Sequence, residues 1–83
     1  MKILYFSWIK DNIGKSEENI KLNEEIKTIS DLINYLTSLN ENYKNAFSDM
    51  TSIKFSKNMN VVDINESINN NDEVAFFPPM TGG

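Results

Sequence analysis

The side chains that usually perform unaided catalysis are scarce in this 83-residue chain. It contains no cysteine, no histidine and no arginine. These absences remove thiolate and imidazole metal ligands, the commonest nucleophiles, the usual general base at neutral pH and the bidentate clamp for anions. The carboxylate pairs fall in expected loops or at strand starts, where a solvated surface is the favoured interpretation: Glu17-Glu18, Glu24-Glu25 and Asp72-Glu73. We therefore predict neither an enzyme that acts alone nor a metal site.

The C-terminal segment has a different character. Pro78 and Pro79 favour an extended, stiff backbone, and Gly82 and Gly83 have no side chains. At about 3.3–3.6 Å per residue, residues 78–83 can reach roughly 20 Å. Such a thin tail can enter a channel that larger residues would block. The competing interpretation is a frayed terminus or a remnant of an expression sequence.

The first half of the chain predicts two strands and a helix. Residues 2–9 combine aromatic and β-branched types, which predicts a strand that is apolar on both faces. Turn residues surround Gly14, and the alternation at Ile20 and Leu22 predicts a second strand paired with the first. Thr28 is expected to cap the most secure helix, whose apolar residues follow at helical spacing: Ile29, Leu32, Ile33, Leu36 and Leu39.

The second half predicts shorter elements. Residues 43–50 have helical spacing, residues 53–56 and 59–62 alternate as two short strands, and residues 73–77 form a last apolar strand that Pro78 ends. This order predicts an α+β fold, a mixed sheet with one main helix packed on one face. The first and last strands can then lie parallel at its centre. We expect one domain over residues 1–77 and an extended tail over residues 78–83.

Strand alternation predicts an apolar surface on the other face of this sheet. If Ile3 and Tyr5 face the helix, then Leu4, Phe6 and Trp8 point away from it, and Ala75 and Phe77 do the same on the last strand. We expect Phe6, Phe77 and Val61 to form an exposed patch that binds a partner. The alternative is that residues 43–50 cover this face.

Composition narrows the choice of partners. The net charge of −4 has the wrong sign for a surface that follows phosphates, so we predict no nucleic-acid binding. No apolar run approaches the roughly 20 residues that span a bilayer, and the first residues do not resemble a leader peptide. We expect a soluble cytoplasmic protein.

The end of the chain carries a family resemblance. Residues 72–79, Asp-Glu-Val-Ala-Phe-Phe-Pro-Pro, followed by Met80-Thr81-Gly82-Gly83, resemble the C-terminal signature of the small, sulfur-carrier subunit of molybdopterin synthase. The opening strand, the Thr28-capped helix and Asn58 resemble the same family in pattern. The family is a ubiquitin-like β-grasp. Two residues depart from its usual sequence: Asn71 replaces a glycine, where we expect a left-handed backbone, and Met80 replaces a β-branched residue.

This resemblance implies a role for the terminal carboxylate. A partner similar to ubiquitin-activating adenylyltransferases would use ATP to adenylate Gly83, and sulfur would then replace AMP to give a thiocarboxylate. The large synthase subunit would bind the tail, so that the sulfur can attack cyclic pyranopterin monophosphate and build the dithiolene. Gly82 would allow threading, and the contact residues would be Phe6, Val61, Phe77, Pro78, Pro79, Met80 and Thr81. The family's heterotetramer is expected, with no cofactor bound to the small subunit.

Three other functions remain open for such a chain. A sulfur carrier for thiamine synthesis also ends in Gly-Gly, although a Phe-Phe-Pro-Pro tail is not expected of it. A ubiquitin-like modifier would join Gly83 to lysine side chains, and a plain interaction module would not activate Gly83 at all.

Overall fold

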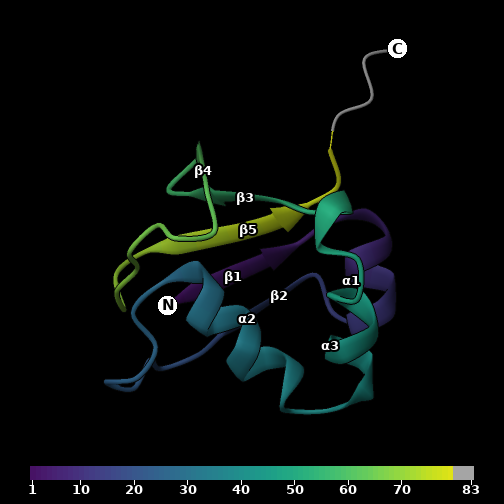
Figure 1. Cartoon of the computed structure of the whole chain (residues 1–83), viewed down its shortest axis with the longest axis horizontal. Helices are drawn as coiled ribbons and strands as arrows, with labels where there is room; N and C mark the ends of the chain where they lie inside the picture. The colour runs from purple at the N-terminus through teal and green to yellow at the C-terminus, as the bar shows by residue number, and fades with distance from the viewer. Residues whose placement is uncertain (80–83) are drawn as a thin grey trace.

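The computed structural model describes residues 1–79, and these form one mixed sheet with helices packed against it (Figure 1). The five strands have the order β2-β1-β5-β3-β4. Their bounds are β1 Lys2–Tyr5, β2 Glu17–Asn19, β3 Lys54–Lys57, β4 Asn60–Val62 and β5 Glu73–Phe77. The helices are α1 Ser7–Ile13, α2 Ile29–Thr37, α3 Glu41–Ala46 and the short 3₁₀ helix η1 Met50–Ser52.

The first and last strands are parallel neighbours, as predicted. Ile3 lies opposite Val74, and Tyr5 lies opposite Phe76. β5 is the middle strand because β3 pairs antiparallel with its other edge. β2 and β4 are antiparallel outer strands. The prediction of an α+β fold with a mixed sheet is therefore confirmed, and Phe77 ends a strand that is held on both sides.

The predicted strand over residues 2–9 is wrong beyond Tyr5. Ser7 has a φ of 57°, in the left-handed region, which ends the extended backbone and begins α1. Ile9 and Ile13, four residues apart, are the buried side chains of this helix. Trp8 also packs against the core instead of pointing to the opposite side of the sheet. Residues with a high strand propensity thus form a helix here, because Ser7 turns the backbone and the side chains after it pack into the core as a helix.

The second strand lies earlier than predicted. Glu17–Asn19 pairs with β1, whereas Ile20 and Leu22 lie outside the strand. The backbone N–H of Ile20 donates to the Met1 carbonyl at 2.9 Å, and Leu22 is buried beside a loop. A short edge strand is held mainly by backbone hydrogen bonds, so three polar residues suffice and apolar alternation is a poor guide to its position.

The main helix begins where the sequence predicts. Thr28 Oγ1 accepts from the Asp31 backbone N–H at 3.2 Å, and Asp31 Oδ2 accepts from the Thr28 N–H at 3.1 Å, which makes a complete capping box. Its buried face comprises Ile29, Leu32, Ile33 and Leu36. Leu39, predicted to continue that face, is 46% exposed because the helix ends at Thr37.

The core lies between the helices and one face of the sheet. Tyr43, Ala46 and Phe47 of the predicted short helix are buried in the same cluster as the inward residues of β1 and β5. The Phe76 ring stacks on Tyr5 with a centroid distance of 6.0 Å and meets Phe47 edge-on at 5.0 Å. The alternative that residues 43–50 cover the other face is therefore wrong, and in Figure 1 α2 and α3 lie on one side of β1 and β5.

Candidate functional site

The root of the C-terminal tail is fixed by the middle of the sheet. β5 ends at Phe77, and Pro78 and Pro79 follow with partial exposure. The Phe6 backbone N–H donates to the Phe76 carbonyl at 3.1 Å, and Phe77 pairs in register with Lys54 of β3. Neither proline has an N–H that could continue the ladder. The predicted contact residues Met80 and Thr81 and the predicted reactive pair Gly82 and Gly83 lie outside the described residues.

The uncovered face of the sheet carries an apolar hollow of about 360 Å³. Phe6, Val61 and Phe77, which the sequence predicted as one patch, all line it. Phe6 is 47% exposed and Val61 is 74% exposed. The complete lining, called the open-face hollow below, is Leu4, Phe6, Ser56, Met59, Val61, Glu73, Ala75 and Phe77. The structure thus brings the three predicted contact residues together beside the root of the tail.

Sequence reasoning missed Met59 as a member of this surface. Its side chain is 90% exposed, and its φ of 72° is left-handed. The sequence predicts that Met59 begins the returning strand, but β4 begins at Asn60. The available signal was Asn58, because asparagine is typical of the first central position of a two-residue hairpin turn with positive φ.

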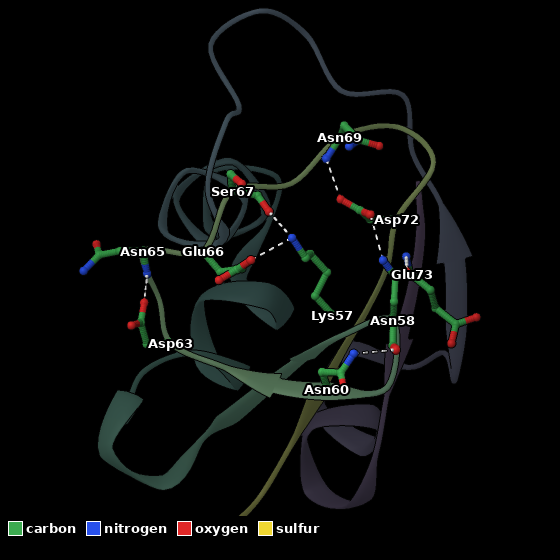
Figure 2. A network of polar contacts seen from close by, with 10 residues as sticks. All are labelled: Lys57, Asn58, Asn60, Asp63, Asn65, Glu66, Ser67, Asn69, Asp72 and Glu73. Carbon is green, nitrogen blue, oxygen red and sulfur yellow. Dashed lines mark hydrogen bonds and ion pairs between the residues drawn. The ribbon is translucent and has the colours of Figure 1, made fainter.

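A polar network fixes the opposite end of β5 from the tail (Figure 2). Asn58 Nδ2 donates to Asp72 Oδ1 at 2.9 Å, and Asn58 Oδ1 accepts from the Glu73 backbone N–H at 2.9 Å. Asp72 Oδ2 accepts from the Asn69 backbone N–H at 2.8 Å. The Asp72-Glu73 pair therefore has a structural role as a turn anchor, beyond the solvated surface that we expected.

The same region corrects the expectation for Asn71. In residues 1–79 the non-glycine residues with positive φ are Ser7, Asn58 and Met59, so Asn71 does not have the left-handed backbone expected of a glycine replacement. Its N–H donates to Asn69 Oδ1 at 2.9 Å. The turn is thus closed by the side chain of Asn69 and the backbone of Asn71, and it needs no unusual φ at position 71.

A second polar cluster ties α3 to the sheet on its helix-covered side. Glu18 Oε2 accepts from the hydroxyls of Tyr5 and Tyr43, each at 2.6 Å. Lys15 Nζ lies 3.4 Å from Glu18 Oε1. The pair Glu17-Glu18 was predicted to be solvated surface, and this is wrong for Glu18, whose side chain is only 16% exposed. The signal was present in Tyr5 and Tyr43, because a buried tyrosine hydroxyl needs a partner.

Electrostatics identifies this cluster as a structural anchor. Burial alone would raise the pKa of Glu18, but the hydroxyls of Tyr43 and Tyr5 and the nearby Lys15 outweigh burial and hold the pKa below its ordinary value. Burial and the hydrogen bond to Glu18 raise the pKa of Tyr5 well above its ordinary range. Glu18 is therefore an ionised acceptor and Tyr5 a neutral donor, which leaves neither free for proton transfer near neutral pH.

A family match covers almost the whole chain. The sequence matches the ThiS family over residues 3–83. The chain belongs to the ThiS family. A curated relative of this ThiS-family chain is the molybdopterin synthase sulfur carrier subunit of Escherichia coli (strain K12). The two are 25% identical over 83 residues, which cover 100% of this chain and 99% of the relative.

Solved structures agree with the ubiquitin-like β-grasp fold. A Pyrococcus furiosus protein, titled as a candidate molybdopterin converting factor, subunit 1, superposes with a TM-score of 0.75 at 25% identity and covers 95% of each chain. The small archaeal modifier protein 1 of Haloferax volcanii has a TM-score of 0.74 at 18% identity, covering 96% of this chain and 97% of its own. The second likeness concerns the fold alone.

The described part of the ThiS-family chain offers neither a metal site nor a membrane-spanning helix. Within residues 1–79, no three carboxylate, histidine or cysteine side chains gather closely enough to hold a metal ion. Over the same range, every helix is too short or too polar to cross a membrane. The arrangement that the structure offers is therefore a firmly held tail root beside an open apolar face.

Proposed function

We propose that this ThiS-family chain is the sulfur-carrier subunit of a molybdopterin synthase. The observation that carries the proposal is the Asp72–Gly83 sequence, Asp-Glu-Val-Ala-Phe-Phe-Pro-Pro-Met-Thr-Gly-Gly, which includes the middle strand of the sheet, Glu73–Phe77. Support comes from the Escherichia coli relative with that name, which the chain matches along its full length. Such a subunit would work in the cytoplasm, where ATP is available.

The reaction would use the terminal carboxylate of Gly83. An adenylyltransferase partner joins this carboxylate to the α-phosphate of ATP and releases pyrophosphate, which gives an acyl-adenylate. Hydrosulfide from a sulfur donor then attacks the acyl carbon, so that a C–S bond forms, the C–O bond to AMP breaks, AMP leaves with the electron pair and the S–H proton is lost to solvent. The product is a thiocarboxylate. Activation is needed because an ionised carboxylate is a poor acceptor for nucleophiles.

The large synthase subunit would then use this sulfur. It binds the tail and presents the thiocarboxylate to cyclic pyranopterin monophosphate, and two carriers in turn supply the two sulfur atoms of the dithiolene. Water cleaves the bond that remains to the acyl carbon and restores the Gly83 carboxylate. The small chain supplies the nucleophile, and its partner supplies the groups that bind substrate and move protons, so the carrier needs no bound cofactor.

The open-face hollow would be the docking surface for that large subunit. Phe77 is both part of the hollow and the last strand residue before the tail. A partner that receives the tail must therefore pass close to the hollow, where Phe6 and Val61 lie exposed. In the expected heterotetramer, two large subunits at the centre would each cover the open face of one small chain.

The test is the identity of the last residue. Deleting Gly83 should leave the unfolding midpoint nearly unchanged, because a terminal residue buries little surface, and should abolish ATP-dependent thiocarboxylate formation. Adding one residue after Gly83 should do the same. Gly82→Val should fold but react slowly, because a β-branched side chain widens the tail and restricts its backbone.

Mass spectrometry after incubation with ATP, adenylyltransferase and a sulfur donor provides the measurement. The intact chain should gain the mass of one sulfur-for-oxygen exchange at Gly83, and the thiolated chain with the large subunit should convert the pyranopterin. Sulfur transfer by the chain that lacks Gly83 would refute the proposal. A ladder of lysine conjugates would support a ubiquitin-like modifier in its place.

A further inference from the structure

The connection between β3 and β4 is a turn of only two residues. Lys57 and Asn60 are paired across the hairpin, which leaves Asn58 and Met59 as the two central residues. Their φ angles are 51° and 72°. Two successive positive φ values in a two-residue hairpin are the signature of a type I′ turn, which matches the twist of the flanking strands.

The two central residues differ in how well they tolerate a positive φ. Asparagine tolerates the left-handed region, and the Asn58 side chain also bonds to Asp72 and to the Glu73 backbone (Figure 2). Met59 occupies the position at which type I′ turns favour glycine, because a Cβ is strained there. With 90% of its side chain exposed, Met59 offers little packing to its own chain in return. Glycine at this position would suit the fold better.

The Met59 side chain nevertheless lies on a particular surface. It lines the open-face hollow together with Val61 and Phe77. In the sheet register Lys57 is opposite Val74, whereas Lys54 is opposite Phe77, so the turn lies at the opposite end of β5 from the tail. The hollow therefore runs along β5 between the strained turn and the root of the tail.

Strain at an exposed residue points to a function outside the chain's own packing. We infer that Met59 is an orienting contact for the large subunit, inserting its thioether side chain into an apolar pocket of that partner. This inference rests on the proposed function. A contact at each end of β5 fixes the direction in which the tail enters its channel, which a patch near Phe77 alone does not do. An unbranched, polarizable side chain is suited to such a pocket.

A set of substitutions at Met59 separates strain from contact. Met59→Gly should raise the melting temperature of the isolated chain by about 4 °C and weaken binding to the large subunit by about tenfold. Met59→Asn should behave similarly, because asparagine tolerates the backbone but lacks the apolar reach. Met59→Leu keeps both the strain and the apolar side chain, so neither quantity should change much. Leu39→Ala, at an exposed leucine outside the hollow, is the control for loss of apolar surface.

The measurements are thermal unfolding of each full chain and calorimetric titration with the purified large subunit of the same organism. Opposite changes in stability and affinity for Met59→Gly would support the inference, since a structural role would change both in the same direction. Equal affinity of Met59→Gly and the wild type would overturn it and leave the proposed function intact. Absence of binding by the wild-type chain would overturn both. A dimer of the chain alone that Met59→Gly dissociates would assign the contact to a second copy.

Discussion

The two faces of the central sheet differ in what covers them, although the same strands supply both. On the helix-covered face, Ile3, Tyr5, Val74 and Phe76 are almost completely buried. On the other face, the residues that alternate with them line the open-face hollow. Among these, Phe6, which directly follows β1, is 47% exposed. Neighbours in sequence such as Phe76 and Phe77 thus have opposite surroundings.

This difference explains why β1 after Lys2 and β5 after Glu73 carry apolar residues on both faces. A strand that covers a core on one face only should alternate between apolar and polar residues. Residues 74–77 do not alternate, although the second face of β5 lines the open-face hollow, where Ala75 is buried and Phe77 is half-buried. An apolar face that the fold leaves uncovered favours a binding surface. The pattern of β5 is thus that of a strand covered twice, once by the chain's own helices and once, under the proposed function, by a partner.

Substitution of the adjacent phenylalanines should give the largest contrast between the faces. Phe76→Ala should lower the free energy of unfolding by about 3–5 kcal/mol, because it removes a ring at the centre of the core. Phe77→Asp should leave the chain folded, since Phe77 is only partly buried, and should weaken association with the large subunit. Urea unfolding and calorimetric titration measure the two effects. Collapse of the circular dichroism spectrum of isolated Phe77→Asp would place Phe77 in the core and break the contrast.

Much of the fold was predictable because several local signals agree with it. The capping box at Thr28 and the apolar spacing of α2 are local features, and both are present as predicted. β5 was recognisable by its continuous apolar run before Pro78. The predicted strand over residues 2–9 was too long because strand propensity extends past Tyr5. The turn at Ser7 and the burial of Ile9 and Ile13 depend on packing against elements distant in sequence.

The candidate site was predictable in part for the same reason. Phe6, Val61 and Phe77 followed from strand alternation, and the structure gathers them in one hollow. Glu18 was missed because a carboxylate beside another carboxylate is usually solvated, and its two tyrosine donors are 13 and 25 residues away. Met59 was missed because its backbone conformation depends on the register of β3 and β4. The roles of Gly82 and Gly83 stay predictions.

A smaller loss of stability is expected on the helix-covered side of the sheet, where Glu18 accepts from two tyrosine hydroxyls. Glu18→Gln keeps the shape of the side chain but removes the charge that two tyrosine hydroxyls stabilise. Because hydrogen bonds to charged groups are stronger than those between neutral groups, the variant should lose about 1–2 kcal/mol of unfolding free energy at pH 7. Urea unfolding of both chains gives this difference.

The difference in stability between the wild-type chain and Glu18→Gln should depend on pH. The pKa of Glu18 is lowered in the folded chain, so its contribution to stability is present above its ordinary value of 4.5 and is lost as pH falls through the lower folded value. The gap between wild type and Glu18→Gln should therefore narrow below about pH 4.5. A gap that stays constant down to pH 3 would mean that the charge of Glu18 does not stabilise the fold.

The smallest effect on stability is expected from a valine-to-threonine substitution on the open face, compared with the same substitution on the covered face. Val61→Thr keeps a β-branched side chain on β4, and because Val61 is 74% exposed, the free energy of unfolding should change by no more than about 0.5 kcal/mol. Val74→Thr is the matched control on β5, where the hydroxyl enters a fully buried position and should cost about 1–3 kcal/mol. Equal losses at the two positions would show that the fold uses both faces alike. A stable Val61→Thr chain that binds the large subunit several-fold more weakly would show that the open face is apolar for the partner and not for the fold.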